Sequence, residues 1–288
     1  MDAFGGLVTA EYLPLLFAEG AGSLLLKFMP FVLFFELPLS LLVVVGVIKY
    51  TLERRYEGER DPFFPPVSCI ITCYSEGRDV QKTIISLTEQ IYPGKIEMLA
   101  MIDGASKNKL TYDSAMEMSE YVSGFRNRKL VVVPKWQRGG RVSSLNTGLN
   151  FASGEIVMAL DGDTSFDNNM VERVTRHFED PAISAVSGCL RVRNADESLT
   201  ASLQAIEYFV SIQASKTGLS AFNMVNNISG AFGVFRKNVL DLVEGWDAGT
   251  AEDLDITLRI KNYFGRYKKK FRIVFDPEAI GHTDAPST

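Results

Sequence analysis

Residues 28–48 most restrict how this chain can fold, because 21 consecutive positions carry one charged residue, Glu36. An α-helix of that length rises about 30 Å, which matches the hydrocarbon core of a bilayer. Pro30 and Pro38 would kink such a helix without preventing a span. A cleaved signal peptide has a shorter apolar region before small residues, whereas KYTLERRYEGER follows here. We predict a transmembrane helix at about 28–48, with a buried core helix or an uncleaved signal sequence as alternatives.

The basic residues around this segment predict its orientation. One lysine, Lys27, precedes it, whereas four basic residues follow it: Lys49, Arg54, Arg55 and Arg60. By the positive-inside rule, the N-terminus lies outside the inner (cytoplasmic) membrane and the following domain lies in the cytoplasm. Residues 5–18 are also apolar, and they either lie at the membrane interface or form a second, shorter insertion.

The rest of the chain alternates strand and helix patterns, which predicts an α/β fold. The proline-rich residues 61–66 separate it from the apolar segment, so we assign 1–50 to the membrane segment, 51–66 to a cytoplasmic linker and 67–288 to the folded domain. Repeated β-α-β units form a doubly wound, mostly parallel sheet that binds ligands at the carboxyl ends of its strands. Strand patterns occur at 67–72, 96–102, 129–134, 155–160 and 183–188, and helical spacing at 78–90, 110–122, 142–151 and 169–178.

Composition excludes several classes of function. The formal net charge of −5 gives no overall attraction to nucleic acid, so we expect no nucleic-acid partner. Three cysteines with no C-x-x-C pair argue against a disulfide framework or a structural zinc site, and we expect them to be reduced in a cytoplasmic core. The chain has two histidines, His177 and His282, which argues against a histidine metal cage or a Ser-His triad.

Two predicted strands end in acidic residues. Asp103 ends one of them, and Asp161-Gly162-Asp163 ends another. Two aspartates separated by one residue can converge on a divalent cation, and magnesium typically takes one or two carboxylates together with substrate phosphates. A D-x-D sequence alone is a weak signal, but its position after an apolar strand strengthens it. Asp161 and Asp163 are therefore a candidate site for a divalent cation such as Mg²⁺.

A third acidic site opens a predicted helix at 251–264. Glu252, Asp253 and Asp255 lie in its first turn, where acids complement the helix dipole and cap the helix. One carboxylate would suffice for capping. Three acids are compatible with one of them acting as a general base.

These motifs together resemble the family 2 glycosyltransferases, and in particular the membrane-bound processive synthases of β-linked polysaccharides such as poly-N-acetylglucosamine, cellulose and chitin. The resemblance covers about residues 65–288, and its six motifs occur in the family's order. They are the first strand and base loop at 68–76, the second strand end at 102–104, the basic-x-x-x-Leu-Asn segment at 139–146, the D-x-D at 161–163, the acceptor-side strand at 229–236 and the T-E-D-like segment at 251–253.

The resemblance implies a GT-A fold, a UDP-sugar donor, a glycan acceptor and inverting transfer. It places Tyr74, Glu76 and Asp103 at the base and ribose, Asp161 near ribose and metal, and Asp163 on the metal, Mg²⁺ or Mn²⁺. It makes Asp253 the base that deprotonates the acceptor hydroxyl. The remaining implied substrate contacts are Arg141, which would face phosphate, together with Ser229, Gly230, Trp246 and Glu252. The lipid bilayer and accessory membrane subunits are further expected partners.

The sequence departs from the family pattern at several positions. Residues 72–76 replace the common Pro-x-x-Asn-Glu, Ala251 stands where Thr is common, and Arg141 stands where Lys is usual. No Q-x-x-R-W motif follows residues 283–286, and no later apolar segment follows them either. We therefore expect an amino-terminal portion of a synthase, or a short form that binds nucleotide without making long polymer.

Three other classes of protein share some of these features. A phosphatase of the D-x-D type would place its motif on the first strand, but three predicted strands precede Asp161. An NAD-dependent enzyme needs a G-x-G-x-x-G motif after the first strand, but residues 72–80 contain one glycine, Gly77. A pseudo-transferase that binds nucleotide sugar without turnover stays open. Within the transferases, 244–247 and 251–255 favour an N-acetylglucosamine polymer, and Trp246 either stacks on an acceptor sugar or packs in the core.

Overall fold

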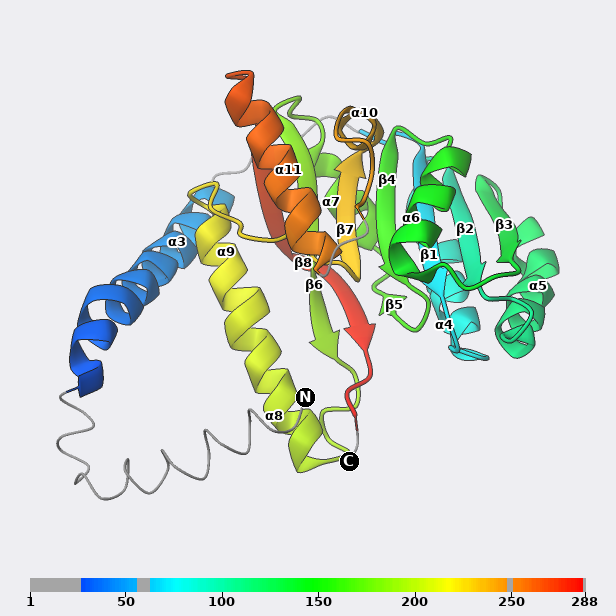
Figure 1. The fold of residues 1–288 in the computed structure, drawn as a ribbon, viewed down its shortest axis with the longest axis horizontal. Coiled ribbons are helices and arrows are strands. Elements are labelled where there is room, and N and C mark those ends of the chain that lie inside the picture. Colours follow the sequence, from blue (N-terminus) through cyan, green and yellow to red (C-terminus); the bar gives the residue numbers. More distant parts are fainter. Residues whose placement is uncertain (1–26, 56–62, 248–250, 287–288) are drawn as a thin grey trace. The chain divides into compact units, whose positions relative to one another are not determined.

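The computed structural model describes residues 27–55, 63–247 and 251–286 (Figure 1). The chain divides into two compact units between Val45 and Gly46, and each is described here by itself. The apolar stretch at 5–18 lies outside the described residues, as do residues 56–62 of the linker predicted at 51–66. The domain boundaries proposed from the sequence therefore stay predictions.

An apolar helix comes first among the described elements. It contains a π-helical turn, η1 (Val32–Glu36), followed by α3 (Leu37–Arg55). Among the described residues, Lys27–Arg54 is the one helix whose length and composition would allow it to cross a membrane. Pro38 lacks an N–H for the carbonyl of Phe34, and the preceding N–H of Leu37 bonds to Val32 five residues back. The proline thus explains the wide turn.

The last turns of α3 pack on α9 (Ser215–Ser220) within the second unit. Gly46 lies so close to Gly218 that an added Cβ would be 2.1 Å from the carbonyl oxygen of Gly218. Just beyond this crossing, Nζ of Lys49 donates to the carbonyl of Ala221 at 2.8 Å. These contacts fix the end of the apolar helix to the folded domain.

Eight strands of the described residues form one mixed sheet in the order β3-β2-β1-β4-β7-β6-β8-β5. All strands except β5 and β7 run in the same direction, because β7 pairs antiparallel with β4 and β6, and β5 pairs antiparallel with β8. The mostly parallel sheet predicted from the sequence is confirmed. The bounds are β1 (Val67–Cys73), β2 (Ile96–Asp103), β3 (Arg128–Lys135), β4 (Ile156–Asp161), β5 (Ser165–Phe166), β6 (Ile183–Val192), β7 (Phe232–Arg236) and β8 (Arg272–Thr283).

Helices cover both faces of the sheet, so the central strands β1 and β2 are buried at every position and consist mostly of apolar residues. Neighbouring residues of β1 enter different cores: Ile71 packs with α4 (Asp79–Thr88), whereas Ile70 packs with α6 (Gly140–Phe151). The first core also contains α5 (Lys109–Ser123) and α7 (Met170–His177), and the second contains α10 (Lys237–Leu242) and α11 (Glu252–Arg266).

A second long helical segment runs beside β6 (Figure 1). It consists of α8 (Leu199–Tyr208), the π-helix η2 (Phe209–Ala214) and α9 without a break. Ser198 caps its start by accepting a hydrogen bond from the N–H of Ala201 at 3.1 Å. Leu203, Ile206 and Val210 share one face through their helical spacing, and all three are exposed.

Candidate active site

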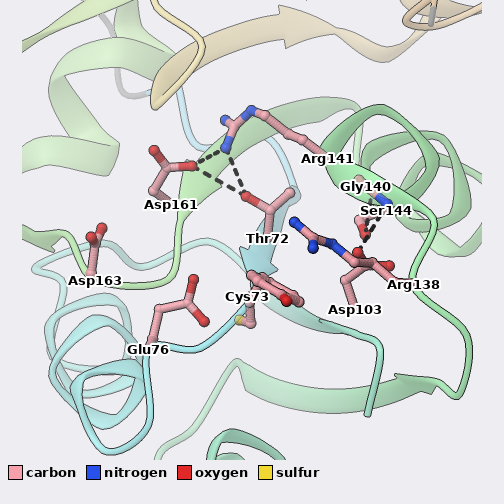
Figure 2. Close-up of a pocket in the computed structure, with 11 residues that line it drawn as sticks. Thr72, Cys73, Glu76, Asp103, Arg138, Gly140, Arg141, Ser144, Asp161 and Asp163 are labelled. Atoms are coloured by element: carbon pink, nitrogen blue, oxygen red, sulfur yellow. Dashed lines mark hydrogen bonds and ion pairs between the residues drawn. The ribbon is translucent and has the colours of Figure 1, made fainter. Parts of the chain in front are cut away.

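The carboxyl ends of β1, β2 and β4 open into a pocket of about 340 Å³ (Figure 2). Parallel strands bring their carboxyl ends to one edge, which explains why acids that are distant in the sequence meet there. Six of the residues predicted from the sequence line this pocket: Tyr74, Glu76, Asp103, Arg141, Asp161 and Asp163. Thr72, Cys73, Arg138, Gly140 and Ser144 complete it.

Three carboxylates gather on one side of the pocket, and Asp103 lies on the other (Figure 2). Partial burial in the cleft raises the pKa of the Asp163 carboxyl, and repulsion from Asp161 adds a smaller rise. Burial also raises the pKa of Glu76, although backbone hydrogen bonds oppose it. One carboxylate oxygen of Glu76, Oε2, is buried without a hydrogen-bond partner among the described residues. Negative charge is therefore concentrated, and incompletely compensated, on this side of the pocket.

The donor atoms on this side fit a hard divalent cation. Carboxylate oxygens are the ligands that Mg²⁺ prefers, and the orphaned oxygen of Glu76 offers one more. Across the described ranges, no group of three or more His, Cys, Asp or Glu side chains is arranged to hold a metal ion with protein ligands alone. A cation bound here would need ligands from a substrate as well, such as phosphate oxygens.

Arg141 joins the donor-side acids to the start of α11. Its Nη1 bonds to Asp161 and, at 2.9 Å, to Oγ1 of Thr72 (Figure 2). Its Nη2 donates to the carbonyl of Gly230 at 2.6 Å, and its Nε lies 3.0 Å from Oε1 of Glu252. One guanidinium thus connects four separate segments of the chain, using the planar set of donors that lysine lacks.

Asp103 has a fully hydrogen-bonded carboxylate. It accepts from the backbone N–H groups of Gly139 and Gly140 at 2.8 and 2.9 Å, and from Nζ of Lys135 at 2.9 Å. Burial alone would raise the pKa of Asp103, but these hydrogen bonds outweigh it and hold the pKa below its usual value. Asp103 therefore stays charged and fixes the loop between β3 and α6.

Arg138 is a pocket residue that the sequence motifs did not single out. Its guanidinium lies over the ring of Tyr74, 4.0 Å from the ring centroid. Tyr74 is itself 42% exposed, so its ring is accessible to a ligand. A signal was present in the sequence, because Arg138 directly precedes the Gly139-Gly140 pair that begins the basic-x-x-x-Leu-Asn segment.

The acceptor-side residues lie next to Arg141. Gly230 faces the start of α11, since an added Cβ would be 3.3 Å from Oε1 of Glu252 and 3.7 Å from Cβ of Asp253. Asp253 accepts from Nδ2 of Asn227 at 2.9 Å and from the N–H of Leu254 at 2.8 Å. Glu252 and Asp253 thus lie beside Gly230 at the start of α11.

Five of the predicted residues are not among those that line the pocket: Ser229, Gly230, Trp246, Glu252 and Asp253. Gly230, Glu252 and Asp253 lie next to Arg141, as described above, whereas Trp246 and Ser229 have other surroundings. Trp246 is 5% exposed and packs edge-on against Phe235, and its backbone N–H donates to Oδ1 of Asn146 at 2.9 Å. This position fits the core alternative that the sequence left open. Ser229 lies beside Gly230 and donates its N–H to Oγ of Ser187 at 3.1 Å.

The chain has a GT-A-type fold. A solved mannosyltransferase from Pyrobaculum calidifontis, in complex with GDP-mannose and Mn²⁺, superposes with a TM-score of 0.60 at 19% identity. The match covers 87% of this chain and 68% of that one.

Residues 65–288 match the model of the glycosyltransferase-like family 2, and the chain belongs to that family. It is similar to poly-β-1,6-N-acetyl-D-glucosamine synthases. The protein of Staphylococcus aureus (strain COL) is 28% identical over 272 residues, which are 91% of this chain and 62% of the relative. That of Staphylococcus epidermidis is 29% identical over 268 residues, which are 90% of this chain and 61% of the relative. The chain thus spans about three fifths of these relatives.

Proposed function

We propose that this protein transfers a sugar, with inversion, from a UDP-sugar to a β-linked glycan. The observation that carries the proposal is the pocket at the strand ends, where Glu76, Asp161 and Asp163 face Arg141 and where Asp253 lies just beyond Gly230. This arrangement provides a place for a diphosphate beside a place for an acceptor hydroxyl. The family membership supports the reaction class.

The donor would lie across the pocket from Asp103 to Asp163. Tyr74 offers an exposed ring for the base, and Arg138 above it offers a second planar surface. Asp103 and the N–H groups that it holds would position the ribose. Arg141 would exchange one of its carboxylate partners for a phosphate oxygen, because guanidinium groups bind both in a bidentate manner.

A divalent cation would be held by Asp163 and Asp161, with Glu76 nearby, and would offset the negative charge of the leaving diphosphate. The Mn²⁺ bound with GDP-mannose in the Pyrobaculum mannosyltransferase complex supports Mn²⁺ or Mg²⁺ here. Both aspartates must be deprotonated to serve as ligands.

Asp253 would act as the general base for the acceptor. Its carboxylate is oriented from two sides, by Asn227 and by the backbone of Leu254, and it faces Gly230, whose missing side chain leaves room. Inverting transfer needs a single in-line attack on the anomeric carbon, so one base suffices. Glu252, held by Arg141, would contact the substrate next to it.

We further propose that the chain is anchored in the inner membrane, with residues 67–288 in the cytoplasm and the N-terminus outside. The apolar helix Lys27–Arg54 and the basic residues after it support this arrangement. The similarity to poly-β-1,6-N-acetyl-D-glucosamine synthases favours N-acetylglucosamine as the sugar, with accessory membrane subunits as partners.

Binding of UDP and UDP-N-acetylglucosamine, with and without Mn²⁺, tests the donor site. Calorimetry should show affinity that rises strongly with metal in the wild type and no such dependence in Asp163→Ala. Equal affinity with and without metal would reject the donor assignment. UDP release in the presence of short β-linked glucosamine oligomers then tests transfer.

The second candidate is a nucleotide-sugar-binding protein without polymerising activity. The chain spans about three fifths of the length of the similar synthases, so their polymerising activity is not carried over to it. Size-resolved products from a labelled donor separate the two candidates. Long polymer supports the synthase, whereas binding with at most slow hydrolysis or single transfer supports the second candidate.

A further inference from the structure

A second pocket of about 220 Å³ lies away from the strand-end site, where the last turns of α3 meet α7, the end of α9 and the start of β8. Its lining is rich in arginine: Arg54, Arg173, Arg176 and Arg272 all contribute. None of these residues takes part in the proposed transfer. The pocket therefore needs an explanation of its own.

The carboxylates in this pocket already have partners. Glu278 is shared between Arg54 and Arg173, which bind its two oxygens from different sides. Asp276 is buried and lies 2.8 Å from Nε2 of His177 through its Oδ2, while its Oδ1 accepts from the N–H of Glu278 at 2.9 Å. These acids are engaged in holding the pocket walls together.

The basic groups, in contrast, are incompletely paired. Nε of Arg173 is buried without a hydrogen-bond partner, as judged over the described residues. Arg176 and Arg272 are exposed at the rim. Neither guanidinium has a hydrogen bond or ion pair with any residue that the structure describes. A buried donor without a partner is costly, so a ligand that accepts hydrogen bonds would stabilise this pocket.

The chemistry of these donors selects a phosphate. Guanidinium groups match the oxygens of phosphate with two parallel hydrogen bonds, and three of them converge here. A phosphate monoanion or dianion would accept hydrogen bonds from Arg176 and Arg272, because the acids at the rim, Glu53 and Asp180, already pair with Lys49 and with the N–H of Ala182. An apolar ligand would leave these groups unsatisfied.

The position of the pocket along the apolar helix indicates that the phosphate would come from a lipid. Tyr50 and Arg54 line it, and they follow the predicted end of the span at Ile48 by two and six residues. At 1.5 Å per residue they lie about 3–9 Å beyond the hydrocarbon core. The headgroup layer extends roughly 5–7 Å beyond that core. The pocket would thus open at the depth of lipid phosphates in the leaflet that carries anionic lipids.

We propose that this pocket binds the phosphodiester headgroup of an anionic phospholipid of the cytoplasmic leaflet, through Arg173, Arg176 and Arg272. The inference rests on the membrane anchoring in the proposed function. Since Arg54 and Glu278 join the end of α3 to β8 at the same place, an occupied pocket would hold the domain at a fixed distance from the membrane.

Titration of the detergent-solubilised full chain with short-chain phosphatidylglycerol, followed by native mass spectrometry, tests the proposal. The wild type should bind phosphatidylglycerol in preference to phosphatidylcholine. Arg176→Gln/Arg272→Gln should weaken that binding at least about tenfold. The matched control is Lys268→Gln/Lys270→Gln, which removes the same charge from exposed residues close to β8 but outside the pocket, and it should retain most of the binding. Metal-dependent UDP binding should stay unchanged in both variants and serves as the folding control.

Three results would overturn the proposal. An equal loss of phosphatidylglycerol binding in both double variants would indicate general attraction to the charged surface. Equal binding of phosphatidylglycerol and phosphatidylcholine by the wild type would show that the pocket is not a site for anionic headgroups. Saturation by glycerol 3-phosphate at the same concentration would make a soluble phosphate the ligand. Alkaline carbonate extraction of native membranes is a separate measurement, since release of the chain would refute the anchoring itself rather than the phosphate chemistry.

Discussion

Nε of Arg141 lies 3.0 Å from Oε1 of Glu252, and this ion pair connects the donor side of the candidate site to helix α11, whose second residue, Asp253, is the proposed base. The same guanidinium bonds to Asp161. The three side chains are less than one third exposed, so water screens them only in part. A donor that binds at Asp161 would therefore change the contacts of Arg141, and through them the position of Glu252 at the start of α11.

A double-mutant cycle tests this connection. Arg141→Ala and Glu252→Ala should each lower the free energy of unfolding, and their coupling should be about 1 kcal/mol, at the upper end for a partly exposed pair. Urea unfolding of the two single variants and the double variant gives that value. The surface pair Arg259 and Asp255, four residues apart on α11, is the control and should give about 0.3–0.5 kcal/mol. A coupling near zero for the first pair would show that the two sides are independent.

Asp163→Asn should make the ligand-free domain more stable while removing metal-dependent donor binding. The wild-type carboxylate is disfavoured by partial burial and by the charge of Asp161, and the amide avoids both costs. We expect a rise in Tm of about 1–3 °C without ligand, measured by calorimetry. UDP with Mn²⁺ should then stabilise the wild type and leave the variant unaffected. A lower Tm of the ligand-free variant would contradict this account.

The raised pKa values of Glu76 and Asp163 predict a pH dependence with opposite signs for stability and for metal binding. Their ordinary values are 4.5 and 3.8, and both are raised in the folded domain. Between the ordinary and the raised pKa the folded state binds more protons than the unfolded state, so the free energy of unfolding falls as pH rises through that window. Metal binding requires a charged Asp163 carboxylate, so affinity for Mn²⁺ with UDP should rise across the window set by the raised pKa of Asp163.

Comparison of the wild type with Glu76→Gln/Asp163→Asn isolates these two groups. The difference in unfolding free energy should change with pH above about 4 and level off once both acids are ionised. The change should be absent if neither group has a shifted pKa. Calorimetric titration with Mn²⁺ and UDP at several pH values measures the second half of the prediction.

Asp253→Asn should keep UDP affinity and lose sugar transfer by at least about 10²-fold, because the amide cannot accept the acceptor proton. Asn227→Ala removes a hydrogen bond that orients the same carboxylate, so we expect a smaller loss. Asp255→Asn is the matched control, since its side chain pairs with Arg259 on the same helix. Labelled product formed per unit time reports all three. Near-normal transfer by Asp253→Asn would place the base elsewhere.

The central strands could be predicted because their sequence reflects burial on both faces. β1 and β2 are buried at every position, and a short, mostly apolar run such as VSCIITC is typical of a strand that is covered on both faces. The position of β7 could not be predicted in the same way. It lies antiparallel between β4 and β6, and Ala185 pairs with Phe235, 50 residues later. Nothing local in a sequence specifies such long-range pairing.

The acids of the active site could be predicted together because strand ends of a parallel sheet share one edge, which brought Asp103, Asp161 and Asp163 to one pocket. The contact of Arg138 with Tyr74 depends on how two loops fold over that edge, so residue spacing does not reveal it. Trp246 shows the converse. Its motif allowed either a sugar platform or a core position. Phe235 and Asn146 hold it in the core, and only the tertiary packing determines this.

The order of the sheet leaves β3 at one edge, with a row of backbone groups open to a neighbour. Such edges recruit strands from other molecules and start aggregation. In β3 the residues Arg128, Lys129, Pro134 and Lys135 supply charge at both ends and remove one backbone donor. A preparation of the domain should therefore stay monodisperse at high concentration, whereas Lys129→Val, at an exposed position of this strand, should form oligomers that grow with time and bind thioflavin T.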